Sequence, residues 1–269
     1  MLDDVGNEAY SRSLPRLSSA DRHVISSNEQ YRNLHAGKRC FVIGNGPSLR
    51  KQDLSHLAND VTFVMNAFCK HEVVTKWQPT YYFFSDPVLF DGSESSAEFF
   101  RTLKTTIHET TFFVPVNHKE IIEKERILPP ESTRFFAQSG RVLGEDTNEV
   151  VDFARPVPSA ETIAQTAIMG AIYMGCSPIY LMGLDHDWLA HHGETGYNFY
   201  PGLILNNHPQ VTGKLGDYGR QMESLLRVWR SYERLQVIVE KKGIKVLNAT
   251  NGGFLDLFER VSYEALFRE

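Results

Sequence analysis

The sequence has no excess of basic residues, because 33 Asp and Glu outnumber 28 Lys and Arg and leave a net charge of −5. Proteins that bind nucleic acid gather Lys and Arg on one surface, so this balance argues against a nucleic-acid partner. The chain also lacks the run of roughly 20 apolar residues that a membrane helix needs, and its first residues lack the basic and then apolar regions of a signal peptide. We therefore expect a cytoplasmic protein, with peripheral contact with the inner membrane left open.

Cysteine is scarce as well, with only Cys40, Cys69 and Cys176 in the chain. Their odd number, the absence of metal-type spacing and their apolar neighbours are typical of buried, reduced thiols in a cytosolic protein. Internal repeats and low-complexity tracts are also absent. No Gly-x-Ser-x-Gly sequence occurs, which disfavours a Ser-His-Asp hydrolase.

From Arg39 onward, short apolar runs bounded by turn residues alternate with amphipathic segments. This alternation predicts an α/β fold with a Rossmann-like, mainly parallel sheet and helices on both faces. The length suits a single domain over residues 38–269, preceded by an N-terminal arm or leading helix over residues 1–37. The expected strands are Cys40–Ile43, Val61–Met65, Tyr81–Phe84, Thr111–Val114, Arg134–Ala137, Ile179–Met182 and Lys245–Leu247. The expected helices are Leu49–Leu57, Ala97–Thr105, Lys119–Glu125, Ala160–Met174 and Tyr218–Lys242.

The last expected helix carries a clear apolar stripe. Its apolar residues recur at helical spacing while Arg and Glu fill the opposite face, which predicts that the stripe packs in the core. The stripe consists of Met222, Leu225, Leu226, Trp229, Tyr232 and Leu235.

The first candidate site is the turn Gly44-Asn45-Gly46-Pro47-Ser48, which follows an expected buried strand and precedes an expected helix. Small residues there let backbone N–H groups approach a phosphate beside a helix N-terminus, so the turn resembles a nucleotide cradle. It lacks the third glycine of the dinucleotide fingerprint and the Lys-Ser/Thr of a P-loop. A tight turn with Ser48 as helix N-cap is the alternative interpretation.

Polar residues follow the next two expected strands, at Asn66 and at Asp86. The carboxyl ends of parallel strands share one sheet edge, so Asn45, Asn66 and Asp86 should converge there. An amide such as Asn66 can bind a base edge or a ribose hydroxyl, because it carries both donors and an acceptor. The Asp86 carboxylate would need a ribose hydroxyl, a protonated partner or a divalent cation between itself and a phosphate.

A second group lies at Ser159 and Thr162, just before a helix rich in small residues. One of the two hydroxyls is a natural N-cap. A free hydroxyl beside a helix N-terminus would also suit a nucleotide phosphate or a sugar carboxylate.

The strand Ile179–Met182 runs into an Asp-x-Asp pair formed by Asp185 and Asp187. Two carboxylates at a strand end can hold a divalent cation such as Mg or Mn against a diphosphate. The alternative is that Asp185 orients its loop by accepting hydrogen bonds from backbone amides.

The segment at about residues 185–219 is polar and rich in Gly, His, Asn and Tyr, which is typical of a lid or binding loop; a disordered insertion is the alternative. A histidine there could take a proton from an acceptor hydroxyl near neutral pH. The candidates for this general base are His191, His192 and His208. Phosphate oxygens could be bound by the tyrosines Tyr197, Tyr200 and Tyr218.

Several segments of the sequence together resemble the bacterial sialyltransferases that use CMP-sialic acid. They are the glycine turn followed by Leu49, the segment Asp53 to Asp60, the strand ending at Asn66, the Asp86-Pro87 strand end and the block from Tyr173 to Asp185. It is also similar to a wider group with the archaeal 6-hydroxymethylpterin diphosphokinases and the flagellin nonulosonate transferases. The match spans roughly Arg39 to Asp187.

This resemblance implies a nucleotide-binding catalytic domain with a mobile lid, metal-independent in the sialyltransferase branch. Asn45 and Asn66 match amides of that family's nucleotide site, and Thr162 falls near a hydroxyl of its donor pocket. Asp86 departs from the pattern, since the sialyltransferases have Asn there. The family's lid histidine has no counterpart where Lys214 to Asp217 stand, so His208 is its substitute.

The expected function is therefore transfer of a sugar, a nonulosonate such as sialic acid, from a CMP-activated donor to a glycan hydroxyl in surface polysaccharide or lipopolysaccharide synthesis. The alternatives are a diphosphokinase that uses Mg and ATP, and a non-catalytic nucleotide-binding module. For the sugar transfer no cofactor is certain and a role for Mg or Mn stays open. The oligomeric state, a homo-oligomer included, also stays open.

Overall fold

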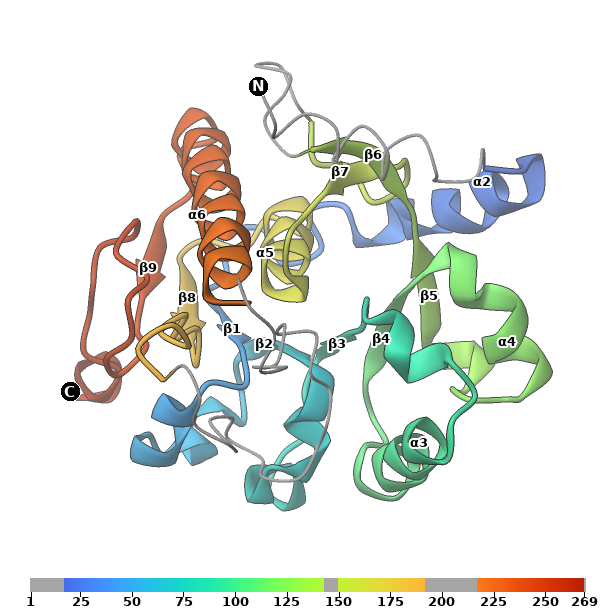
Figure 1. Ribbon diagram of the computed structural model, residues 1–269, viewed down its shortest axis with the longest axis horizontal. Helices are drawn as coiled ribbons and strands as arrows, with labels where there is room; N and C mark the ends of the chain where they lie inside the picture. The colour runs from blue at the N-terminus through green and yellow to red at the C-terminus, as the bar shows by residue number, and fades with distance from the viewer. Residues whose placement is uncertain (1–16, 143–149, 192–216, 269) are drawn as a thin grey trace.

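A seven-stranded parallel sheet with the strand order β5-β4-β3-β2-β1-β8-β9 forms the centre of the protein (Figure 1). The computed structural model describes residues 17–142, 150–191 and 217–268. Most strand residues are apolar and buried, as is usual for a parallel sheet that is covered on both faces. The sheet strands are β1 Cys40–Ile43, β2 Val61–Met65, β3 Tyr81–Phe83, β4 Thr111–Pro115, β5 Thr133–Phe136, β8 Ile179–Met182 and β9 Val246–Asn248. All seven expected strands are therefore present, with boundaries that differ from the sequence predictions by one residue or not at all.

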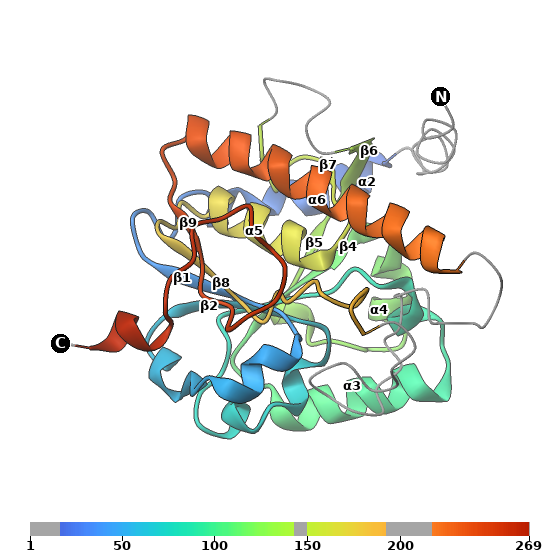
Figure 2. The same cartoon turned by 60° about the vertical axis from the view of Figure 1, so that its left-hand side comes forward.

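Helices cover both faces of the sheet, as the sequence predicts. On one face lie α5 (Ile163–Tyr173) and α6 (Asp217–Lys241), side by side in both views; on the other lie α3 (Glu94–Thr106) and α4 (Lys119–Lys124) (Figures 1 and 2). Successive strand residues alternate between two cores, so that Val42 belongs to the core that includes α5 and α6, and Phe41 to the core that includes α3 and α4. The fold is thus α/β and Rossmann-like.

The expected helix over Leu49–Leu57 is wrong. Two short 3₁₀ turns stand there instead, Pro47–Lys51 and Leu54–Leu57. Asp53 separates them, because its carboxylate accepts a hydrogen bond from the N–H of Ser55 and so caps the second turn.

The apolar stripe of α6 is only partly core. Tyr232 and Leu235 are buried, but Met222 and Leu226 are each 51% exposed. At about 100° per residue, Leu226 lies about 120° around the helix from Tyr232, so the predicted stripe was wider than the face that packs on the sheet. Val228 and Val239 complete the buried face instead.

Two strands were missed by the sequence analysis. β6 (Gln138–Val142) and β7 (Val157–Ser159) pair in parallel as a separate two-stranded sheet. The first is polar and the second is only three residues long. Neither gives the apolar run on which the strand predictions depended.

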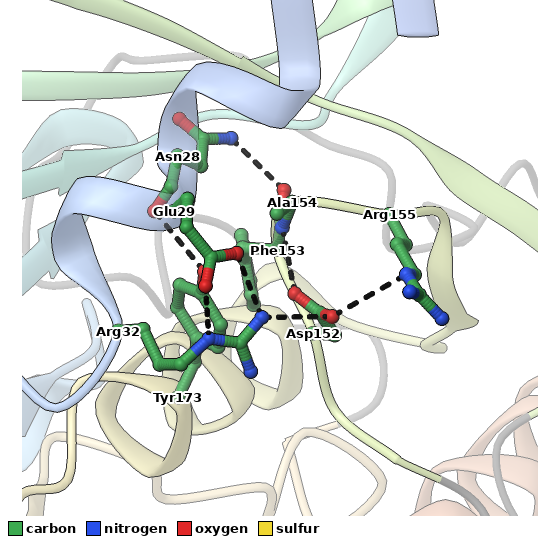
Figure 3. Close-up of polar contacts among 8 residues, drawn as sticks. All are labelled: Asn28, Glu29, Arg32, Asp152, Phe153, Ala154, Arg155 and Tyr173. Carbon is green, nitrogen blue, oxygen red and sulfur yellow. Dashed lines mark hydrogen bonds and ion pairs between the residues drawn. The ribbon is translucent and has the colours of Figure 1, made fainter.

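The described part of the N-terminal segment is docked on the domain. Helix α2 (Ser19–Ser26) leads into a 3₁₀ turn, Ser27–Tyr31, from which the buried Asn28 side chain donates hydrogen bonds to the carbonyls of Phe135 (2.7 Å) and Phe153 (3.0 Å). Arg32 then pairs with Asp152 at 3.0 Å (Figure 3). These contacts join the leading helix to the end of β5 and to the segment that precedes β7.

The three cysteines are free and buried, as expected. Among the helices of the described ranges, none combines the length and the apolar character needed to cross a membrane.

Candidate functional site

The sheet changes its direction of winding at β1. This strand pairs with β2 on one side and with β8 on the other, whereas the chain runs outward from β1 to β5 before it returns to β8. In open parallel sheets, ligands bind outside the carboxyl ends of the strands at such a point. The turns that follow β1 and β8 therefore define the candidate site.

The glycine turn after β1 lies directly against the backbone that follows β8. The N–H of Gly44 donates to the Met182 carbonyl (2.8 Å) and that of Gly46 to the Gly183 carbonyl (2.9 Å). A Cβ atom on Gly44 would lie 2.4 Å from the Gly183 carbonyl oxygen, and one on Gly46 would lie 1.7 Å from a carboxylate oxygen of Asp185. Both glycines are thus required by the close approach of two strand ends.

Asp185 holds the glycine turn in place. One oxygen of its carboxylate accepts from the N–H of Ser48 (3.1 Å), and the other accepts from the Ser48 hydroxyl (2.8 Å). The residue is only 6% exposed, and burial raises the pKa of its carboxyl group. The interpretation of Asp185 as a loop-orienting residue is confirmed, whereas Ser48 as an N-cap is wrong, because its hydroxyl is bound to this carboxylate.

These contacts limit what the turn can offer to a phosphate. The N–H groups of Gly44, Gly46 and Ser48 all donate within the protein, and Pro47 has none. Three of the four N–H groups of the glycine turn are therefore used within the protein, and a phosphate would have to bind largely to other donors.

Asn45 and Asn66 carry unpaired amide oxygens at neighbouring strand ends. The Asn45 amide donates to the Met65 carbonyl (3.0 Å), and Asn66 follows directly with a left-handed backbone (φ 49°). The buried hydroxyl of Tyr82 donates to the Asn66 carbonyl (2.5 Å) and so fixes that conformation. Within the part of the chain that the structure describes, the Oδ1 atoms of both asparagines are buried without a hydrogen-bond partner. An unpaired buried acceptor is unfavourable by about 1–3 kcal/mol, so both atoms suit donors of a ligand.

The start of α5 borders the same edge. Thr162 caps the helix in a capping box with Gln165, and the Thr162 side chain also bonds to the buried hydroxyl of Tyr232. That hydroxyl lies 2.9 Å from Nε2 of His186, in the turn after β8. Ser159, at the end of β7, has a buried hydroxyl with no hydrogen-bond partner in the described ranges.

The Asn45 side chain reaches the residue directly before Asn66, so these two residues lie close together as predicted. Hydrogen bonds run from the end of β2 through Asn45 and the glycine turn to Asp185, and from its neighbour His186 through Tyr232 to Thr162. Asp86 lies in the turn after β3, one strand further along this edge, and caps a 3₁₀ turn by accepting from the N–H of Val88 (3.0 Å).

The metal site predicted at Asp185 and Asp187 stays a prediction. Asp187 lies 3.9 Å from Nε2 of His191. Residues 17–142, 150–191 and 217–268 contain no group of three or more His, Cys, Asp or Glu side chains placed to hold a metal ion. Both oxygens of Asp185 already accept hydrogen bonds from Ser48.

Most of the lid lies outside the described residues, and so do four of its predicted site residues, His192, Tyr197, Tyr200 and His208. His191 is described and is half-buried beside Asp187. Tyr218 lies in the first turn of α6 and is 47% exposed.

Comparison with known proteins identifies solved structures with a similar architecture. No family model matches the sequence, and no curated protein matches it. Among solved structures, the chain is similar to a MAf glycosyltransferase from Magnetospirillum magneticum AMB-1, with 12% identity and a TM-score of 0.50. The match covers 91% of this chain but only 38% of the length of that protein. The chain has a glycosyltransferase-like fold.

Weaker likeness extends to the sialyltransferase CstII from Campylobacter jejuni. The complex of CstII with the substrate analogue CMP-3FNeuAc matches at 16% identity and a TM-score of 0.47, over 84% of this chain and 86% of that one. The complex with a trisaccharide acceptor and CMP matches at 17% identity and a TM-score of 0.45, over the same shares.

Two features of this glycosyltransferase-like fold escaped the sequence analysis. His186 and Tyr232 are 46 residues apart, and nothing in the local sequence pairs them. The turn at Gly252 and Gly253, which braces Asp185 from the side of β9, was also missed, although adjacent glycines are a turn signal.

Proposed function

We propose that the protein is a glycosyltransferase that moves a sugar from a CMP-activated donor to a glycan hydroxyl. The observation that carries the proposal lies beside the switch point of the sheet, where the buried amide oxygens of Asn45 and Asn66 have no partner among the described residues. A nucleoside offers ribose hydroxyls and an exocyclic amine as donors to such oxygens. The choice of CMP, and of a nonulosonate as the sugar, rests on the motif resemblance.

The phosphate of the donor has its best partners at the start of α5. The helix N-terminus carries a partial positive charge, and the unpaired Ser159 hydroxyl lies three residues before the cap at Thr162. This location adds donors to those of the glycine turn, where the N–H groups of Gly44, Gly46 and Ser48 are used within the protein. It also sets the donor sugar beside the turn that follows β8.

The reaction would be a direct displacement at the anomeric carbon. A base removes the proton of the acceptor hydroxyl, the oxygen forms the new glycosidic bond, and CMP leaves with the bonding electron pair, so that the configuration inverts. His191, His192 and His208 are the candidate bases. His191 has a carboxylate 3.9 Å from its Nε2 that could orient the ring. Tyr197, Tyr200 and Tyr218 would bind the departing phosphate. No step is assigned to a metal ion.

A thermal-shift titration with CMP, CTP, ATP, UDP and GDP, each with and without Mg²⁺, tests the donor class, because a ligand that binds only the folded state raises the apparent stability. We expect the largest shift with CMP, in the absence of metal. A response to ATP that requires Mg²⁺ would favour the diphosphokinase instead. No response to any nucleotide would leave a protein that does not bind nucleotides at all.

The role of the unpaired amides has a matched control. Asn66→Gly removes the amide oxygen while keeping a residue that tolerates the left-handed backbone. Asn33→Gly makes the same change at another left-handed position (φ 56°), near the opposite end of α5. We expect the first variant to bind CMP roughly 2- to 12-fold more weakly, as for the loss of one hydrogen bond, and the second to bind normally. Equal affinities would exclude Asn66 from the donor site.

A further inference from the structure

Three aromatic residues from separate elements lie around the carboxyl end of β8. Trp188 lies in the turn after β8, Trp229 lies on α6, and Phe254 follows β9. The His186 ring stands between the two tryptophans, with centroids 5.4 Å from Trp188 and 5.9 Å from Trp229 and both contacts edge-on. Both tryptophans are partly exposed and Phe254 is 53% exposed. We call Trp188, Trp229 and Phe254 the aromatic platform.

A hydrogen bond holds Trp229, and both tryptophans contact the ring of an anchored histidine. The indole N–H of Trp229 donates to the Asp256 carboxylate at 3.0 Å. His186, which touches both indoles, has a left-handed backbone (φ 49°) and lies 2.9 Å from the hydroxyl of the fully buried Tyr232. This part of the platform is therefore anchored in the core.

Hydrogen bonds also fix the turn that carries Phe254. The Arg260 guanidinium donates to the carbonyls of Gly252 (2.6 Å), Gly253 (2.8 Å) and Leu255 (3.1 Å). Gly253 has φ 72°, and a Cβ there would lie 2.5 Å from the carbonyl oxygen of Asp185. The N–H of Phe254 donates to that same oxygen at 2.7 Å. The position of Phe254 is thus set directly against the β8 turn.

Asp185 connects the platform to the proposed donor site. Its carboxylate holds the glycine turn through Ser48, and its carbonyl holds the turn of Phe254. A second substrate beside the donor would therefore meet partly exposed aromatic surface, together with Asp187 and His191, whose polar groups lie 3.9 Å apart in the same turn. A pyranose ring matches this combination, because its C–H face packs on aromatic rings and its hydroxyls bind carboxylate and imidazole.

We propose that Trp188, Trp229 and Phe254 form the acceptor subsite and bind a pyranose ring of the glycan that receives the sugar. This assignment rests on the proposed function, since it needs a donor beside it. The residues act by binding and orienting the acceptor and take no part in the proton transfer.

The experiment measures binding of the wild-type protein to an array of immobilised hexopyranose oligosaccharides, with and without CMP. The test variants are Phe254→Ala and Trp188→Ala. Phe254→Tyr keeps the ring, and Leu34→Ala changes an apolar residue that is equally exposed but belongs to the loop before β1. CMP thermal shifts of all five proteins report on folding and on the donor site.

We expect the array to capture the wild type, Phe254→Tyr and Leu34→Ala with equal affinity, and both test variants roughly 2- to 12-fold more weakly, with unchanged CMP shifts. Equal glycan affinity in all five proteins, or no glycan bound by a wild type that responds to CMP, would overturn the platform. Glycan binding that depends on Phe254 and Trp188 in a protein with no CMP shift would support the platform while refuting the proposed donor.

Discussion

Replacement of Asp185 tests how the two turns at the switch point are held together. Asp185→Ala leaves the Ser48 N–H and hydroxyl without their acceptors, which are 3.1 and 2.8 Å away in the wild type. Loss of a buried partner is unfavourable by about 1–3 kcal/mol per group, so we expect the free energy of unfolding to fall by about 2–6 kcal/mol. The glycine turn should loosen, and the CMP response should weaken with it.

Asp185→Asn keeps the shape of the side chain but removes its charge. The amide oxygen can accept from the Ser48 N–H while the amide group donates to the Ser48 hydroxyl oxygen, so both contacts survive. The variant also removes a carboxylate that is buried in the wild type. At neutral pH we therefore expect a stability within about 1 kcal/mol of the wild type. An essential metal ligand at this position would instead make Asp185→Asn lose Mg²⁺-dependent activity.

The pH dependence gives the sign of the electrostatic contribution. Burial raises the pKa of Asp185 above its ordinary value of 3.8, so the folded protein holds this proton more tightly than the unfolded chain. The resulting stabilisation is complete below the ordinary value and is lost as the pH rises through the pKa of the folded state. Asp185→Asn has no such titration, so its stability relative to the wild type should increase from about pH 4 toward neutrality.

Urea unfolding of the three proteins at several pH values measures both effects. The reasoning would be refuted by an Asp185→Asn protein that is as unstable as Asp185→Ala at pH 7. It would also be refuted if the stability of Asp185→Asn relative to the wild type fell as the pH rose.

Gly46→Ala would place a methyl group 1.7 Å from a carboxylate oxygen of the β8 turn, so we expect a lower Tm and loss of the CMP shift; a normal Tm would show that the turn can move aside. Tyr232→Phe removes the hydroxyl that joins the β8 turn to the start of α5, and urea unfolding should show a loss of about 1–3 kcal/mol with the fold retained. Alanine at whichever of His191, His192 and His208 is the base should lower turnover roughly 10²- to 10⁴-fold with an unchanged CMP shift, whereas full activity in all three variants would exclude a histidine base.

The central sheet could be predicted because its strands are recognisable from their own residues. Runs such as Cys40–Ile43 are wholly apolar and end in turn residues, and they form strands that are buried on both faces. The strand β6 has no such run, since Gln138 to Val142 is mostly polar and depends on its partner β7. The local sequence pattern therefore predicts the strands of the central sheet better than those of the small two-stranded sheet.

The location of the candidate site could be predicted from the sequence better than its mechanism. The position of Asn45 and Asn66 at one sheet edge follows from parallel topology alone. The hydrogen bonds that join the glycine turn to the end of β8 and to Asp185 do not follow from the topology, because Ser48 and Asp185 are 137 residues apart. For the same reason, no local signal identifies His186 and Tyr232 as partners.

The central place of β1 also has a consequence for how the chain is made. The strands β1 to β5 are synthesised first, and β1 remains an apolar edge strand until β8 emerges and pairs with it. Unpaired edges of this kind are where growing chains aggregate or engage chaperones. A chain that ends before Ile179 would contain the whole glycine motif and its contact with β2, but it would lack the partners of Gly44, Gly46 and Ser48 that hold the turn in place.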